Sequence, residues 1–68
     1  MIISVNGTQQ TIPKEATLEN IVKLFTETPI PNGVAVALNY AVITKANWKS
    51  TQVEENDEVE ILWASAGG

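Results

Sequence analysis

The sequence contains no cysteine and no histidine, and it has only four basic residues among 68. Without thiols or imidazoles it has no thiolate nucleophile, no Ser-His or Cys-His pair, no zinc-finger ligands and no disulfide bond. Eight acidic residues leave a net charge of −4, which opposes binding to a phosphate backbone. These absences exclude most catalytic chemistry and disfavour nucleic acid as a partner.

Long apolar runs are also missing, since no stretch approaches the roughly 18 apolar residues of a membrane span. Residues 1–5 lack the basic flank and long apolar stretch of a signal peptide, so we expect a cytoplasmic protein with no membrane partner. A hydrophobic content of 44% predicts a folded chain. This length has room for one small domain but not for a large enclosed substrate pocket.

The first segments alternate apolar and polar residues, as strands do. Residues 1–5 predict a strand, and Asn6-Gly7 after it is typical of a type I′ hairpin turn, because both residues tolerate positive φ. Residues 8–12 predict a return strand that is polar enough to lie at a sheet edge. Pro13 ends its pairing because proline lacks the backbone donor.

The apolar spacing then changes to that of an amphipathic helix. The stripe consists of Leu18, Ile21, Val22 and Phe25. Thr17 is the predicted N-cap, because its hydroxyl can accept a hydrogen bond from the first turn. Two prolines and a glycine in residues 28–33 cannot continue the helix and predict a connector.

Three further strands are predicted after the connector, over residues 34–38, 41–43 and 58–62. Trp48 is expected to anchor an irregular or single-turn segment between the last two, and Trp63 to follow where the final strand begins to leave the sheet. The order is ββαβββ. One helix crossing a mixed sheet of four to five strands predicts an α+β roll.

Only small residues occupy positions 64–68, and the last two are Gly67 and Gly68. We expect a domain over residues 1–63 and a flexible tail over 64–68. A backbone without side chains can thread a narrow channel and present its terminal carboxylate. This group is an anion at neutral pH, since its ordinary pKa is about 3.3–3.7, so another protein must activate it, for example with ATP. A chance Gly-Gly ending is the alternative.

The strand order and the glycine ending together resemble the ubiquitin-like β-grasp fold and, within it, the ThiS family of sulfur carriers in thiamin biosynthesis. The resemblance covers nearly the whole chain. It is carried by Asn6-Gly7, the helix stripe, Trp48 and the segments 34–39, 42–43, 56–61 and 67–68.

This resemblance implies a protein cosubstrate without catalytic residues or bound cofactors. An adenylating enzyme of the ubiquitin-activating type would use ATP to adenylate Gly68, and Gly67 would give clearance in the partner sites. A cysteine desulfurase relay would supply the sulfur of a thiocarboxylate, and thiazole synthase would accept it. The alternatives are a molybdopterin-synthase-type sulfur carrier, a ubiquitin-like modifier of lysines and a β-grasp binding module.

Four residues are candidates for a partner-binding apolar patch of the kind by which β-grasp proteins dock their activating enzymes: Leu62, Trp63, Ala35 and Ala37. The alternative is that Leu62 and Trp63 only cover the helix end or the sheet rim. Five acidic residues within positions 54–60 form either a solvated turn or a surface that steers the protein to a basic partner. They lack the ligand spacing and the glycine of a calcium loop, so we expect no metal site.

Three positions depart from the family's pattern. Tyr40 stands where a glycine often follows the asparagine, and it is a candidate surface contact. Asn56 replaces a glycine, which asparagine can do because it tolerates a left-handed backbone. Residues 64–66 are less bulky than the apolar residues usual before the glycine pair.

Overall fold

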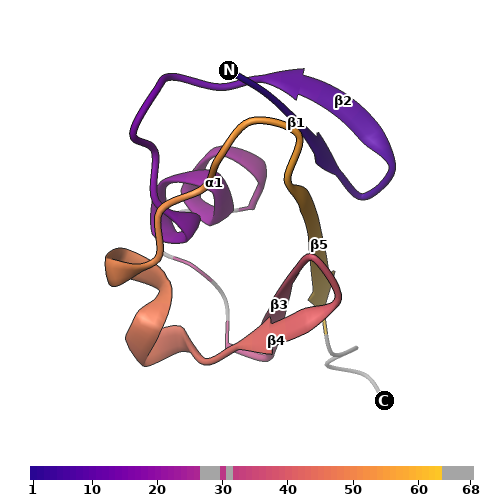
Figure 1. Cartoon of the computed structure of the whole chain (residues 1–68). Coiled ribbons are helices and arrows are strands. Elements are labelled where there is room, and N and C mark those ends of the chain that lie inside the picture. Colours follow the sequence, from indigo (N-terminus) through magenta and orange to yellow (C-terminus); the bar gives the residue numbers. More distant parts are fainter. Residues whose placement is uncertain (27–29, 31, 64–68) are drawn as a thin grey trace.

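Five strands form one mixed sheet in the order β2-β1-β5-β3-β4, with a helix on one side of it (Figure 1). This computed structural model describes residues 1–26, 30 and 32–63. The strands are β1 (Ile2–Val5), β2 (Thr8–Thr11), β3 (Val34–Leu38), β4 (Ala41–Ile43) and β5 (Glu58–Trp63), and the helices are α1 (Leu18–Phe25) and the 3₁₀ helix η1 (Lys45–Ser50). The predicted α+β class and ββαβββ order are confirmed.

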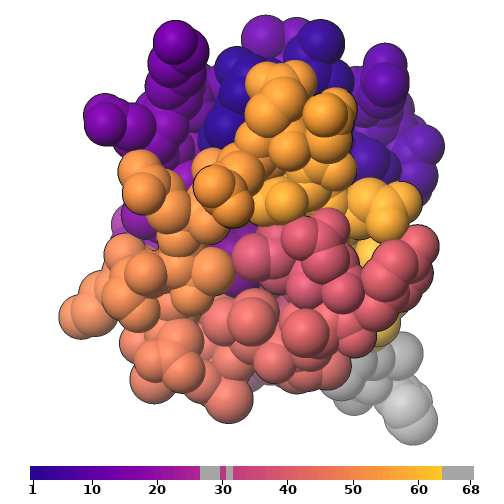
Figure 2. Space-filling view, in the orientation of Figure 1, coloured from indigo at the N-terminus to yellow at the C-terminus, as the bar shows by residue number. Residues whose placement is uncertain are grey.

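The last strand of the described residues is the central strand of the sheet. β5 pairs in parallel with β1 and antiparallel with β3, so it joins the β1–β2 hairpin to the β3–β4 hairpin. β2 lies at an edge, as its polar sequence predicts. In the space-filling view, the segment that leads into β5 (orange) lies between the first strands (indigo) and the β3–β4 hairpin (pink) (Figure 2).

Both hairpins turn through two residues that have positive φ, which is the type I′ geometry. The φ values are 50° and 84° at Asn6 and Gly7, and 49° and 71° at Asn39 and Tyr40. The turn predicted from Asn6-Gly7 is therefore confirmed. Tyr40 is the unusual member, since a bulky side chain rarely adopts a left-handed backbone.

Helix α1 begins with a reciprocal capping arrangement. Thr17 Oγ1 accepts a hydrogen bond from the Asn20 backbone N–H at 3.2 Å, and Asn20 Oδ1 accepts one from the Thr17 N–H at 3.0 Å. The predicted cap is confirmed. The stripe residues Leu18, Ile21 and Val22 are buried against the sheet, which places α1 over one face only.

Trp48 is the largest fully buried side chain, with 2% of its surface exposed. Its indole N–H donates to the carbonyl oxygen of Ile43 at 2.9 Å, so its one polar atom is satisfied. Of the two predicted alternatives for the segment that carries it, the structure has the helical one, the 3₁₀ helix η1. The predicted anchor is confirmed.

One boundary differs from the sequence prediction in a way that matters for the site. β5 continues through Trp63, because Val34 at the start of β3 still pairs with it. Trp63 is therefore the last residue of β5, whereas the sequence predicted that the strand ends at residue 62. The predicted tail at 64–68 and connector positions 28, 29 and 31 lie outside the described residues.

Replacing Trp48 with alanine should lower the free energy of unfolding by about 3–5 kcal/mol, because it leaves a large cavity in a small core. Trp48→Phe, which keeps an aromatic ring, should lose less. Val42→Ala, at a side chain that is 74% exposed, should change the free energy by less than about 0.5 kcal/mol. Urea denaturation followed by circular dichroism measures all three; a Trp48→Ala midpoint equal to that of the unchanged protein would contradict this packing.

Candidate functional site

The sheet has one face that packs on the core and one that no helix of the described part covers. Side chains alternate along a strand, so the neighbours of buried Val59 and Ile61 on β5 point away from α1. We call this side the open face. It carries Ser4, Ala35, Ala37, Val42, Glu58, Glu60 and Leu62.

Three of the four residues predicted to form the partner-binding patch meet on the open face. Ala35 lies directly opposite Leu62, and Ala37 lies opposite Glu60 on one side and Val42 on the other. Leu62 is 59% exposed, so its apolar surface is available to another molecule. Val42 was not among the predicted site residues, because its place beside Ala37 depends on the register of β4.

Trp63 lies apart from this group. It follows Leu62 within β5 and pairs with Val34, so alternation turns its side chain to the same side as Ile61. Half of its surface is nevertheless exposed. The structure therefore places Trp63 at the rim of the helix-covered side and not within the apolar patch of the open face.

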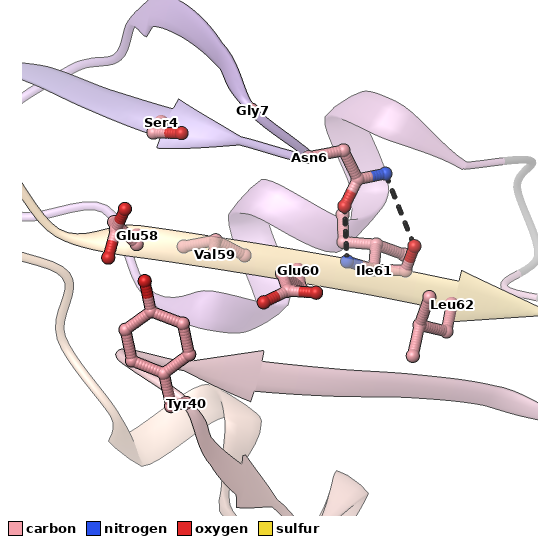
Figure 3. A pocket seen from close by; sticks show the side chains of 9 residues that line it. All are labelled: Ser4, Asn6, Gly7, Tyr40, Glu58, Val59, Glu60, Ile61 and Leu62. Atoms are coloured by element: carbon pink, nitrogen blue, oxygen red, sulfur yellow. Dashed lines mark hydrogen bonds between the residues drawn. The ribbon is translucent and has the colours of Figure 1, made fainter.

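An open groove of about 420 Å³ lies on the open face (Figure 3). β5 crosses it with Glu58, Glu60 and Leu62, while Tyr40 lies on the β3–β4 side and Asn6 on the β1 side. The remaining lining residues are Ser4, Gly7, Val59 and Ile61. This is a surface depression that suits a protruding side chain of another protein.

Tyr40 is held toward the acidic side of this groove. The residue is 78% exposed, and its hydroxyl lies toward the Glu58 carboxylate (Figure 3). A hydrogen bond to Glu58 and the negative charge of that carboxylate raise the pKa of Tyr40 above its ordinary value of 10.0. Glu60 adds a smaller electrostatic contribution in the same direction. The raised pKa of Tyr40 therefore reflects first its hydrogen bond to Glu58 and then the negative charge of the two carboxylates.

The path of β5 beside the groove is fixed by Asn6. Its side-chain oxygen accepts the Ile61 N–H at 2.7 Å, and its side-chain nitrogen donates to the Ile61 carbonyl at 3.2 Å (Figure 3). The amide thus replaces the backbone partner that β1 no longer supplies once the chain turns at Gly7. This pairing holds the C-terminal half of β5, which leads toward the predicted tail.

Gly67 and Gly68, the predicted reactive end, lie outside the described residues. Their roles stay predictions. In residues 1–26, 30 and 32–63 there is no group of three or more acidic, His or Cys residues placed to hold a metal ion. No helix in that part is long and apolar enough to cross a membrane.

Comparison with known proteins identifies a family and several solved structures that are similar to this chain. The model of the ThiS family matches residues 3–68. The crystal structure of the thiamine biosynthesis protein ThiS from Geobacter metallireducens is 26% identical, covers 100% of both chains and has a TM-score of 0.81. The NMR solution structure of a thiamine biosynthesis protein from the same organism is 27% identical, with 100% of this chain and 88% of that chain covered and a TM-score of 0.78. No curated protein matches. The expected ubiquitin-like β-grasp fold is confirmed.

Asn6→Gly should expose the backbone of Ile61, because glycine keeps the positive φ but removes both amide hydrogen bonds. We expect a loss of about 1–2 kcal/mol in the free energy of unfolding and faster hydrogen exchange at the Ile61 amide. NMR-detected exchange measures this, with the Val22 amide in α1 as the internal reference. Unchanged protection at Ile61 would show that the pairing does not hold β5.

Tyr40 is the single tyrosine, so absorbance at alkaline pH reports its ionisation alone. Its midpoint should lie above 10.0, and Glu58→Gln should bring it closer to that value, while Glu15→Gln should leave it unchanged. Since the folded-state pKa is the higher one, the stability that Tyr40 contributes is present below the unfolded-state pKa and is lost as pH rises through the folded-state pKa. A midpoint that Glu58→Gln does not move would contradict the contact.

Proposed function

Because the chain belongs to the ThiS family, we propose that it is a sulfur carrier of thiamine biosynthesis whose Gly68 carboxylate becomes a thiocarboxylate. The observation that carries this proposal is the family match over residues 3–68, which includes both Gly67 and Gly68. The similar structures, both of thiamine biosynthesis proteins, support the same pathway. The protein then acts in the cytoplasm as a cosubstrate of other enzymes.

The chemistry takes place on the terminal carboxylate and uses no side chain of this protein. An adenylating enzyme of the ubiquitin-activating type binds ATP, and the Gly68 carboxylate attacks its α-phosphate, so that pyrophosphate leaves and an acyl-adenylate forms. A persulfide sulfur from a cysteine desulfurase relay then displaces AMP and gives an acyl disulfide. A thiol of the relay cleaves the S–S bond, which leaves the thiocarboxylate and a protein disulfide. Thiazole synthase accepts the carried sulfur.

The composition of the carrier is compatible with this role. A chain without cysteine has no internal thiol that could attack its own activated terminus. Gly67 and Gly68 add no side chains, so the terminus can enter two different partner sites. With no catalytic residues and no cofactor of its own, the protein depends on docking to bring Gly68 to the reacting groups.

The open face is the docking surface in this proposal. The adenylating enzyme covers the apolar patch of Leu62, Ala35, Ala37 and Val42, of which Leu62 and Val42 are exposed large side chains. Trp63, at the rim beside the predicted tail, contacts the partner that holds Gly68. β5 connects both regions, so its position sets where the tail enters the partner.

Removal of Gly68 should abolish adenylation, because the carboxylate of the shortened chain no longer reaches the α-phosphate of ATP. The test incubates the protein with ATP and the adenylating enzyme of the same organism and follows the intact mass, first for an adenylate and then, with the desulfurase relay, for exchange of oxygen for sulfur. Unchanged circular dichroism of the shortened chain serves as the folding control.

Each alternative predicts a different mass. A shortened chain that still accepts AMP would contradict the proposal. Isopeptide adducts on lysines would identify a modifier, and an unmodified full-length chain would leave a β-grasp binding module. Sulfur transfer to a molybdopterin precursor in place of the thiazole would identify the other class of carrier.

A further inference from the structure

The five acidic residues within positions 54–60 are not equivalent in the folded chain. The Glu55 carboxylate accepts the backbone N–H of Ile2, with both oxygens at 3.1–3.2 Å. Asp57 accepts the Glu54 N–H at 2.7 Å and the Asn39 side-chain amide at 3.0 Å. Glu55 and Asp57 are therefore used to hold the turn before β5.

Glu58 and Glu60 lie on the open face and not in the turn. They occupy alternate positions of β5 and both line the groove on the open face. No lysine lines this groove: Lys14 and Lys23 line a second groove beside α1, and Lys45 and Lys49 lie on η1. Within the described residues the one ion pair joins Lys23 to Glu19, at 3.6 Å. The groove thus holds two carboxylates without a cation.

Apolar surface stands directly beside these carboxylates. The exposed Tyr40 ring borders Glu58, and the exposed Leu62 follows Glu60 on the same face of β5 (Figure 3). This groove has two anions, an aromatic ring and an aliphatic wall. It complements a side chain that has a planar, cationic tip and an apolar stem. Arginine has these properties, because its guanidinium can stack on an aromatic ring while its N–H groups bond carboxylates.

We propose that the groove formed by Tyr40, Glu58, Glu60 and Leu62 receives an arginine side chain of the adenylating enzyme and so contributes to the choice of partner. This inference rests on the proposed function, which supplies the identity of the partner. The guanidinium bonds the Glu58 and Glu60 carboxylates and stacks against the Tyr40 ring, while the arginine stem packs on Leu62. The apolar patch beside it provides the remaining contact.

The experiment compares Glu58→Gln, Glu60→Gln and Tyr40→Gly with the unaltered protein in binding to the adenylating enzyme of the same organism. Calorimetry at several salt concentrations gives the Kd and its salt dependence. Glycine at position 40 suits the local φ of 71°, so this variant removes the ring without straining the turn. Glu15→Gln is the matched control, since it removes one negative charge at the second groove, away from the open face.

Each glutamine variant on the open face should raise the Kd about tenfold at low salt and flatten its salt dependence, because a close charge pair is lost. Tyr40→Gly should raise the Kd about threefold or more. Glu15→Gln should leave it within about twofold. Circular dichroism verifies that all four variants keep the fold, as expected for exposed positions.

The outcomes separate this inference from the proposed function. If the unaltered protein is adenylated but the Kd of Glu58→Gln and Glu60→Gln matches that of Glu15→Gln, the arginine site is wrong and the sulfur-carrier proposal stands. The inference would also be overturned if these variants weakened binding to thiazole synthase but not to the adenylating enzyme. If the unaltered protein neither binds the enzyme nor accepts AMP, both proposals fail.

Discussion

The position of β5 is the constraint on which the rest of the structure depends. It comes last in the sequence and lies in the centre of the sheet, and two asparagines hold it from opposite sides. Asn6 pairs with the Ile61 backbone, while the Asn39 side chain accepts the Glu58 N–H at 2.9 Å. Each asparagine is the first of the two central residues of a type I′ turn. In each hairpin, the same residue therefore helps to reverse the chain and aligns the central strand.

Strand alternation lets β5 serve two purposes without a separate loop. Val59 and Ile61 are buried in the core, while Glu58, Glu60 and Leu62 face outward from the same six-residue strand. The outward side chains therefore share the rigidity of the packed ones, and little conformational entropy of the backbone remains to be lost when a partner binds. A recognition surface on a central strand is in this sense preorganised.

Local signals in the sequence were sufficient for much of the fold. The turn at Asn6-Gly7, the cap at Thr17 and the buried helix stripe each depend on a few neighbouring residues, and alternation alone placed Leu62 outward. The contacts that the sequence did not reveal are long-range. The sequence does not show that β5 includes Trp63, because the end of the strand depends on pairing with Val34.

The groove also depends on long-range contacts. Tyr40 meets Glu58 through sheet topology, and the place of Val42 beside Ala37 follows from the register of β4. The patch of Leu62, Ala35 and Ala37 could be anticipated from the sequence. The two carboxylates that line the groove could be told from Glu55 and Asp57 only once those two had their backbone partners.

Asn6 and Ile61, which meet across the sheet, are 55 positions apart. Closing a loop of that length is entropically costly and slow, so the rate of folding should be limited by the docking of β5 between two hairpins that local contacts can form earlier.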